Sequence, residues 1–101
     1  MEQVLSAQTR FSPRRSAFEI RMDILRVAAE GSVKPTHIMY RSNTSWIVLH
    51  KNLESLLAAG FMQQHVDSSR MEYSITDSGR KVFHDYANLV EKAGAPAEAL
   101  E

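Results

Sequence analysis

The sequence contains no cysteine among its 101 residues. A disulfide framework, a zinc site built on thiolates and a cysteine nucleophile are therefore excluded. Long hydrophobic runs are also missing, since those that exist, such as residues 46–49, are far shorter than the roughly 20 residues of a membrane span. Residues 1–15 lack an apolar run of signal-peptide length, so we expect a cytoplasmic protein without a membrane partner.

Motifs of catalysis and of cofactor binding are equally lacking. There is no P-loop, no glycine-rich phosphate loop and no nucleophile elbow. The four histidines, at positions 37, 50, 65 and 84, show no H-x-x-x-H spacing, so a metal site is not expected. The sequence predicts no enzyme, no cofactor and no small-molecule substrate, and its length leaves no room for a separate ligand-sensing domain.

Neither sign of charge is in excess, because 12 Lys and Arg balance 12 Asp and Glu. A net charge of zero argues against a sequence-blind binder of polyanions. The charges are nevertheless divided: residues 1–51 carry eight bases and four acids, whereas residues 52–101 carry four bases and eight acids. Such a basic half can attract phosphate, although chance scatter of charges in a short chain explains the division equally well.

The hydrophobic fraction of 44% suffices for the core of one small domain, which we expect at residues 16–93. Residues 1–15 show no helical or strand period and are expected to form a flexible basic arm. Residues 94–101 are rich in small residues and are expected to form a disordered tail.

Two helices are predicted in the first half of the domain. The first spans about residues 16–30, because Ser16 and Glu19 have the spacing of a capping box and a glycine follows at position 31. The second is short, begins at Pro35 in the favoured first turn and ends at the Ser-Asn pair that follows. Val33, between the two helices, is expected in a very short strand.

A third helix is predicted from residue 44 or 45 to residue 59. Its apolar residues recur at helical spacing and should face the core, and we expect Trp46 to pack there rather than to stack on a base. This core stripe consists of Trp46, Leu49, Leu53, Leu56 and Leu57.

The remainder of the domain is predicted as a hairpin and a closing helix. Strands are expected at residues 61–66 and 71–76, since apolar and polar residues alternate in the second of them, with a turn at residues 67–70. The last helix is expected at residues 77–93. This order of elements predicts a mainly α fold with a small β-hairpin (α+β), the winged helix-turn-helix, in which the third helix protrudes and can enter a DNA major groove.

Several short motifs resemble those of an archaeal winged-helix DNA-binding family that includes a dimeric chromatin-associated protein. These motifs are KPTHIMY at residues 34–40, the Ser-Trp pair at residues 45–46 that opens the third helix, and TDSG at residues 76–79. The similarity covers roughly residues 18–92. It implies a winged helix, double-stranded DNA as the ligand and a homodimer formed by antiparallel pairing of the last helices. We therefore expect a transcription regulator or a chromatin-associated protein, located at the nucleoid.

The candidate DNA-binding residues lie on the arm, on the second and third helices and on the hairpin. Lys51 is suited to a phosphate or a guanine edge, and residues 47 and 48 to thymine methyl groups. Simpler interpretations remain open: helix capping for Thr44 and Ser45, and a solvated side chain for Arg41 or Arg70. The full candidate set is Arg14, Arg15, Lys34, Thr36, His37, Arg41, Thr44, Ser45, Ile47, Val48, Lys51, Ser55 and Arg70.

Two alternatives remain open for the apolar surfaces. Ile47 and Val48 are adjacent and apolar on the outer side of the third helix, which also suits a winged helix that binds a protein and no DNA. The stripe of the last helix either only closes the domain or also pairs with a second copy. Its members are Val82, Phe83, Tyr86, Leu89 and Val90.

Overall fold

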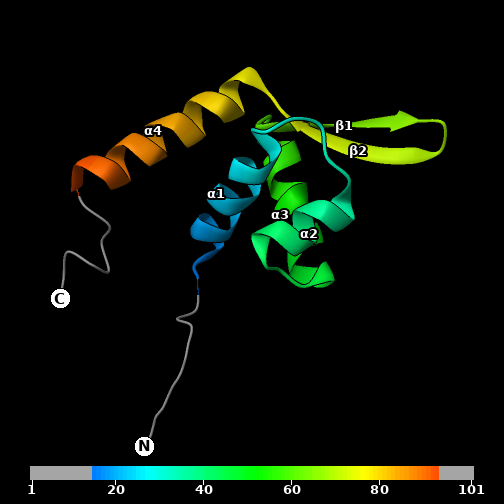
Figure 1. Ribbon diagram of the computed structural model, residues 1–101, viewed down its shortest axis with the longest axis horizontal. Coiled ribbons are helices and arrows are strands. Elements are labelled where there is room, and N and C mark those ends of the chain that lie inside the picture. Colours follow the sequence, from blue (N-terminus) through cyan, green and yellow to red (C-terminus); the bar gives the residue numbers. More distant parts are fainter. Residues whose placement is uncertain (1–14, 94–101) are drawn as a thin grey trace, which may run out of the picture.

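The computed structural model describes residues 15–93, which form four helices and a two-stranded antiparallel hairpin. Helices α1, α2 and α3 pack together, the hairpin extends from one side of them, and α4 extends from the opposite side (Figure 1). The predicted mainly α winged-helix order is therefore confirmed. In chain order the elements are α1 (Ala17–Ala28), α2 (Pro35–Ser42), α3 (Trp46–Ala58), β1 (Met62–Asp67), β2 (Arg70–Ile75) and α4 (Asp77–Ala93).

Helix α1 begins with the predicted capping box. The Ser16 side chain accepts from the backbone N–H of Glu19 (3.1 Å), and the Glu19 carboxylate accepts from the backbone N–H of Ser16 (2.8 Å). The helix buries one side completely, with Ile24, Leu25 and Val27 all at 0% exposure. Its end is followed by Gly31 at φ 139°, a conformation that side chains disfavour.

Helices α2 and α3 are joined by a tight turn. Pro35 occupies the first turn of α2 as predicted, and Asn43 ends that helix in the left-handed conformation (φ 56°). Ser45 then caps α3, because its side chain accepts from the backbone N–H of Val48 (3.2 Å). Two local caps thus set where the turn begins and where α3 begins.

The loop of the hairpin is shorter than predicted, whereas each strand has the predicted length of six residues and lies one position closer to the loop. Asp67 pairs with Arg70, so only Ser68 and Ser69 remain in the loop, at φ 50° and 65°. Two successive residues with positive φ make the tight turn that matches the twist of a hairpin. The predicted short strand is confirmed as a bridge in which Val33 exchanges two backbone hydrogen bonds with Tyr73 (2.9 and 2.8 Å).

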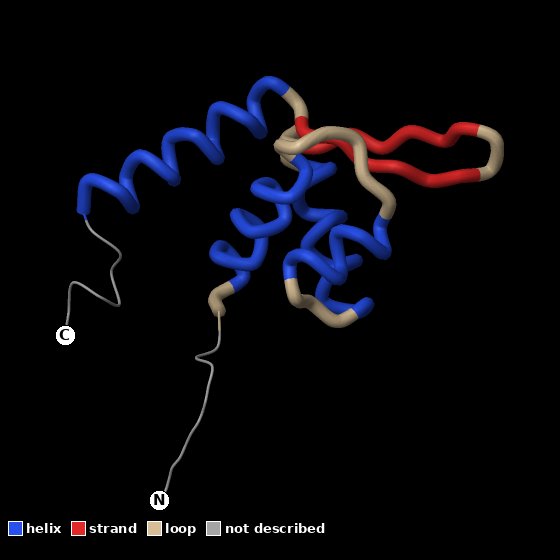
Figure 2. Tube along the Cα trace, in the orientation of Figure 1, coloured by secondary structure: helices blue, strands red, loops and turns tan. Residues whose placement is uncertain are grey.

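The core lies between α1, α2, α3 and the base of the hairpin (Figure 2). Burial of Tyr73 within it raises the pKa of the phenol. None of the helices among residues 15–93 is long and apolar enough to cross a membrane. The buried hydrophobic residues are Met22, Ile24, Leu25, Val27, Ala28, Ile38, Leu49, Leu53, Leu56, Met62, Tyr73 and Ile75.

Helix α4 is attached to the core through its first turn. Gly79 is buried there, and a Cβ on this residue would lie 2.0 Å from the carbonyl oxygen of Phe61. Thr76 begins the helix, because its Oγ1 accepts from the backbone N–H of Gly79 (3.1 Å) and donates to the carbonyl of Gly60 (2.6 Å). The TDSG motif therefore fixes the direction in which α4 leaves the core.

Candidate nucleic-acid interface

The buried side of α3 differs from the predicted stripe. Leu49, Leu53 and Leu56 are buried as expected, but Trp46 is 47% exposed and packs its ring edge-on against His50 (ring centroids 4.3 Å apart). The prediction that Trp46 lies in the core is therefore wrong. Asn52 takes an inner position instead, at 4% exposure.

An arginine from α1 explains why an asparagine is buried in α3. Arg21 Nε donates to Asn52 Oδ1 (2.9 Å), and Asn52 Nδ2 donates to the carbonyl of Val48 (2.8 Å). The buried amide is thereby hydrogen-bonded on both sides, which removes the cost of its burial. This pair joins α1 to α3 and sets the rotation of α3 about its axis.

The outward face of α3 carries Ile47, Lys51 and Glu54. All three are exposed, Ile47 at 79%, and they recur at positions i, i+4 and i+7. At 100° per residue, this face is turned by roughly 60° from the predicted one, on which Val48 and Ser55 were central. Both of those side chains are half-buried, so they flank the outward face instead.

Arg41 of α2 is engaged by an acid of the neighbouring helix end. Its guanidinium donates to both carboxylate oxygens of Glu30 (2.5 and 3.0 Å), a bidentate ion pair with both side chains about half exposed. The hydrogen bonds from Arg41 lower the pKa of Glu30, and Glu30 raises the pKa of Arg41. Arg41 is thus neutralised locally rather than presented as a free cation.

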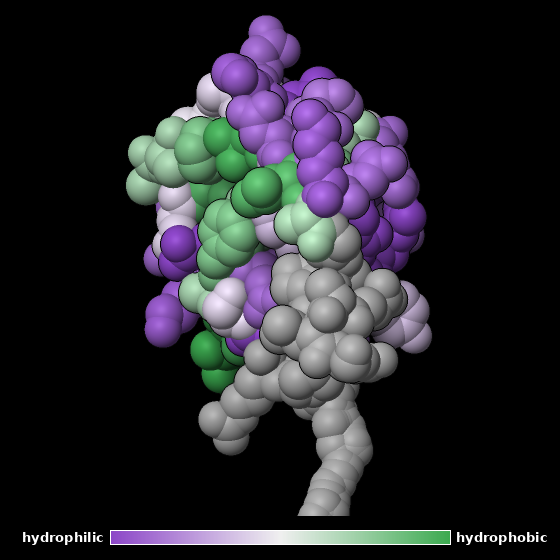
Figure 3. Space-filling model, turned by 90° about the vertical axis from the view of Figure 1, so that its left-hand side faces the viewer, coloured by the Kyte–Doolittle hydropathy of each residue, from purple (hydrophilic) through white to green (hydrophobic). Residues whose placement is uncertain are grey.

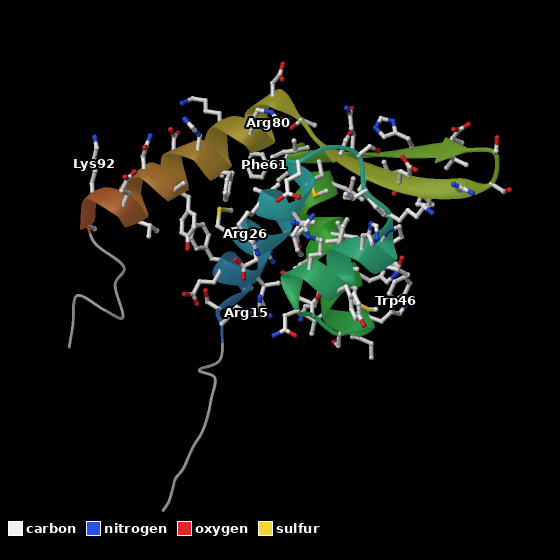
Figure 4. The ribbon with its side chains drawn as sticks, viewed as in Figure 1. Arg15, Arg26, Trp46, Phe61, Arg80 and Lys92 are labelled. Carbon is white, nitrogen blue, oxygen red and sulfur yellow. The ribbon has the colours of Figure 1, made fainter. Side chains whose placement is uncertain are left out.

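Arg15 has a structural environment that the sequence did not indicate. Its guanidinium donates to the carboxylate of Asp23 (2.7 Å) and to the carbonyls of Ser42 (2.7 Å) and Asn43 (2.6 Å) at the end of α2. The prediction that Arg15 belongs to a flexible arm is therefore wrong, because it ties the start of α1 to the end of α2 (Figure 4). Arg14 lies outside the described residues.

The polar candidates around the helix-turn-helix divide into capping and exposed groups. Ser45 caps α3, and Thr44 Oγ1 lies 3.1 Å from the buried Ser42 Oγ. Thr36 and His37 are exposed on α2, and so is Lys34 immediately before it. No hydrogen bond or ion pair engages the Lys34 or Lys51 side chain within residues 15–93.

The hairpin separates charge from apolar surface on its two faces. Val66 and Met71 pair across the strands and are 68% and 38% exposed, whereas Asp67 and Arg70 pair on the opposite face. The exposed Arg70 lies at the tip, immediately after the loop.

Hydrophobic exposure gathers at two ends of the molecule. One end holds Phe18 of α1 (53% exposed) and Leu89 of α4 (66%), with Phe18 edge-on to Tyr86 (5.4 Å). Figure 3 shows hydrophobic side chains gathered on this side of the molecule. The other end comprises the helix-turn-helix and hairpin and holds Tyr40, Trp46, Ile47, Val66 and Met71.

The first half of the predicted apolar stripe of α4 packs against the core of the domain. Val82, Phe83 and Tyr86 pack against the core and are half-buried. Val90 is also half-buried, whereas Leu89 points outward. The apolar stripe thus extends to Leu89 and Val90, past the residues that pack against the core.

The sequence and the fold are similar to those of known winged-helix proteins. The model of the winged helix-turn-helix family matches residues 14–94. The chain belongs to the winged helix-turn-helix family. In the terms of that family, the hairpin is the wing and α3 is the recognition helix. An uncharacterized protein of Methanocaldococcus jannaschii is 30% identical over 78 residues, which cover 77% of this chain and 76% of that protein.

Solved winged-helix structures are also similar. Sso10a-2, a DNA-binding protein from Sulfolobus solfataricus, shares 26% identity with a TM-score of 0.66, over 85% of this chain and 93% of its own. The homodimeric winged helix-turn-helix DNA-binding domain of Mb0332 from Mycobacterium bovis shares the fold at 19% identity, with a TM-score of 0.65, over 73% and 69% of the two chains. The archaeal resemblance inferred from the sequence motifs is confirmed.

The winged-helix geometry adds two residues to the candidate surface, Glu54 on the recognition helix and Tyr40 on α2. Tyr40 is 85% exposed and lies on the side of α2 opposite the buried Ile38. A correct prediction of the buried side of α3 would also have identified Glu54, because it lies seven positions after Ile47 and therefore on the same face of the helix.

Proposed function

We propose that this protein is a homodimer that binds double-stranded DNA, acting in the cytoplasm as a transcription regulator or a nucleoid-associated chromatin protein. The recognition helix enters the major groove and the wing contacts the adjoining backbone. The observation that carries this proposal is the outward face of α3, where Ile47, Lys51 and Glu54 are exposed on the helix that directly precedes the wing in the chain. One such face fits the major groove, which is about 12 Å wide. Sso10a-2, a similar protein of the same fold, is a DNA-binding protein.

Three exposed cations hold phosphate in the proposed complex. Lys34, Lys51 and Arg70 come from the start of α2, the recognition helix and the wing tip. Arg15 and Arg41 contribute less, because acids of the same chain already neutralise them. Three contacts in each protomer give about six in the dimer, so the slope of log affinity against log salt is expected near −5.

The proposed dimer forms at the end of the molecule opposite the wing. Phe18, Tyr86 and Leu89 present apolar surface there, and α4 carries it outward. Pairing would cover this surface and present two recognition helices to one duplex, which raises affinity by avidity. Equilibrium sedimentation tests the dimer: a mass near 11.4 kDa at tens of micromolar would refute it.

A salt titration of duplex binding tests the function. Trp46 is the single tryptophan and lies beside Ile47, so its emission reports occupation of the recognition helix without a label. Lys51→Gln should make the slope shallower by about 2 for the dimer. Lys92→Gln is the matched control, because Lys92 lies at the far end of α4 (Figure 4). No binding at low salt, or equal slopes for both variants, would contradict the proposal.

A second candidate function is protein binding without DNA. The exposed apolar residues Tyr40, Trp46 and Ile47 on the helix-turn-helix favour it, since such patches mark interfaces. A chain with this function binds no duplex at low salt, and Ile47→Ser combined with Val48→Ser abolishes its capture of a protein partner. Unchanged capture by that double variant would exclude it.

A further inference from the structure

Glu54 places a negative charge on the surface that the proposed function turns toward DNA. It is exposed, three residues after Lys51 and seven after Ile47, so the three side chains share the outward face of α3. A carboxylate near phosphate is repelled, and this residue therefore weakens sequence-independent binding.

The other acids from α1 through α3 are engaged within the chain. Glu19 belongs to the capping box, Asp23 is paired with an arginine, and so is Glu30. Within residues 15–93, by contrast, no hydrogen bond or ion pair joins the side-chain carboxylate of Glu54 to another group. Its two oxygens are available to accept hydrogen bonds from a ligand.

Base chemistry identifies which ligand group suits a lone carboxylate in the major groove. Cytosine presents only a donor there, its N4 amino group, which a glutamate can accept. Guanine presents the acceptors N7 and O6, and thymine presents O4, all of which repel a carboxylate. Adenine offers a donor beside the acceptor N7, an intermediate case. Cytosine is thus the base that Glu54 favours most strongly.

We propose that Glu54 is a specificity-determining residue that selects cytosine in the DNA site, an inference that rests on the proposed function. Ile47 contacts a thymine methyl group in the same half-site. The two residues are seven positions apart, or about 10 Å along α3, which matches about three base-pair steps of 3.4 Å. Each half-site therefore carries a thymine and a cytosine separated by about three steps.

Selection from a library of randomised duplexes, followed by sequencing of the bound fraction, tests this inference. The wild-type chain should enrich cytosine at one position of each half-site by about 5- to 150-fold. Glu54→Gln should shift that position toward adenine, because glutamine both donates and accepts and so matches adenine N7 and N6. Glu54→Ala should lose the preference at this position and leave the thymine position unchanged.

Glu91→Gln is the control for the loss of one negative charge, since Glu91 is exposed on the last turns of α4. Its selected sequences should equal those of the wild-type chain. Identical sequences from wild type and Glu54→Gln would overturn the inference while leaving DNA binding established. Failure of the wild-type chain to bind any duplex at low salt would overturn the proposed function, and this inference with it.

Discussion

Arg21 and Asn52 lie 31 positions apart in the sequence, and the Nε of the arginine donates to the Oδ1 of the asparagine over 2.9 Å. The pair is a polar contact between α1 and the recognition helix. Because Asn52 is 4% exposed, its carbonyl oxygen has no easy replacement partner in water. The orientation of the face that carries Ile47 and Lys51 therefore depends on an arginine in another helix.

Replacing Arg21 by methionine should destabilise the domain by about 1–3 kcal/mol. Methionine keeps most of the apolar stem but leaves the buried Asn52 oxygen without a donor. Urea unfolding at neutral pH measures the change, with Arg26→Met as the control because Arg26 is exposed on the same helix. Equal stabilities of the two variants would show that the Arg21–Asn52 contact contributes nothing.

Gly79→Ala should also destabilise, by about 1–3 kcal/mol, although alanine normally favours a helix by about 1 kcal/mol over glycine. The added Cβ would lie 2.0 Å from the Phe61 carbonyl oxygen, which belongs to the backbone and cannot rotate away. Thermal unfolding shows directly whether the substitution raises or lowers the melting temperature. An increase in melting temperature would mean that α4 does not approach Phe61 this closely in solution.

Arg15→Ala should lower the free energy of unfolding by about 1–2 kcal/mol, since hydrogen bonds from a charged donor to Asp23 and to two carbonyls are lost and the site is partly exposed. Arg15→Lys keeps the positive charge but lacks the several donors of the planar guanidinium, so it should recover only part of the lost stability. The salt slope of DNA binding should stay close to that of the wild type. A large change in slope with unchanged stability would instead assign Arg15 to phosphate.

The Glu30–Arg41 pair should make stability depend on pH at the acidic end. Arg41 lowers the pKa of Glu30 in the folded chain, so the contribution is present in full above the unfolded-state value of 4.5 and is lost as the pH falls through the lower folded-state value. NMR titration of the Glu30 carboxyl in wild type and in Arg41→Met measures the shift. Identical titration curves would show that the ion pair does not form in solution.

Glu30→Gln should change DNA binding in the proposed complex. The substitution removes the carboxylate that neutralises Arg41, so this guanidinium becomes available to phosphate. The salt slope should steepen by about 0.9 for each protomer. Combining Glu30→Gln with Arg41→Met should cancel the gain, and persistence of a steeper slope in that double variant would contradict this explanation.

Local signals predicted the boundaries of the elements well. The capping box at Ser16, the proline at position 35 and the serine cap at position 45 each act over a few residues, and the structure confirms all three. The position of the hairpin agrees with the prediction, but its loop is shorter than predicted. Ser68 and Ser69 adopt positive φ there, a conformation that is uncommon for serine and that the sequence therefore does not indicate.

Contacts between distant residues limited the prediction of the site. Asn52 is buried with a hydrogen-bond partner 31 positions away, whereas Trp46, which the apolar spacing places in the core, lies at the surface. The lack of a helical or strand period places Arg15 in the arm, and no local pattern reveals that its partner carbonyls lie 27 and 28 positions further on. A single sequence shows which residues are charged, but not which of those charges the fold neutralises.

The attachment of α4 through Gly79 also bears on the arrangement of DNA half-sites. In the proposed dimer, α4 determines how far apart the two recognition helices stand, and its 17 residues span about 25 Å. Adding one turn beyond the anchored segment would lengthen it by about 5 Å, or about one and a half base-pair steps. Half-site spacing in relatives of this chain can therefore change through the length of α4 alone, without any alteration of the reading surface.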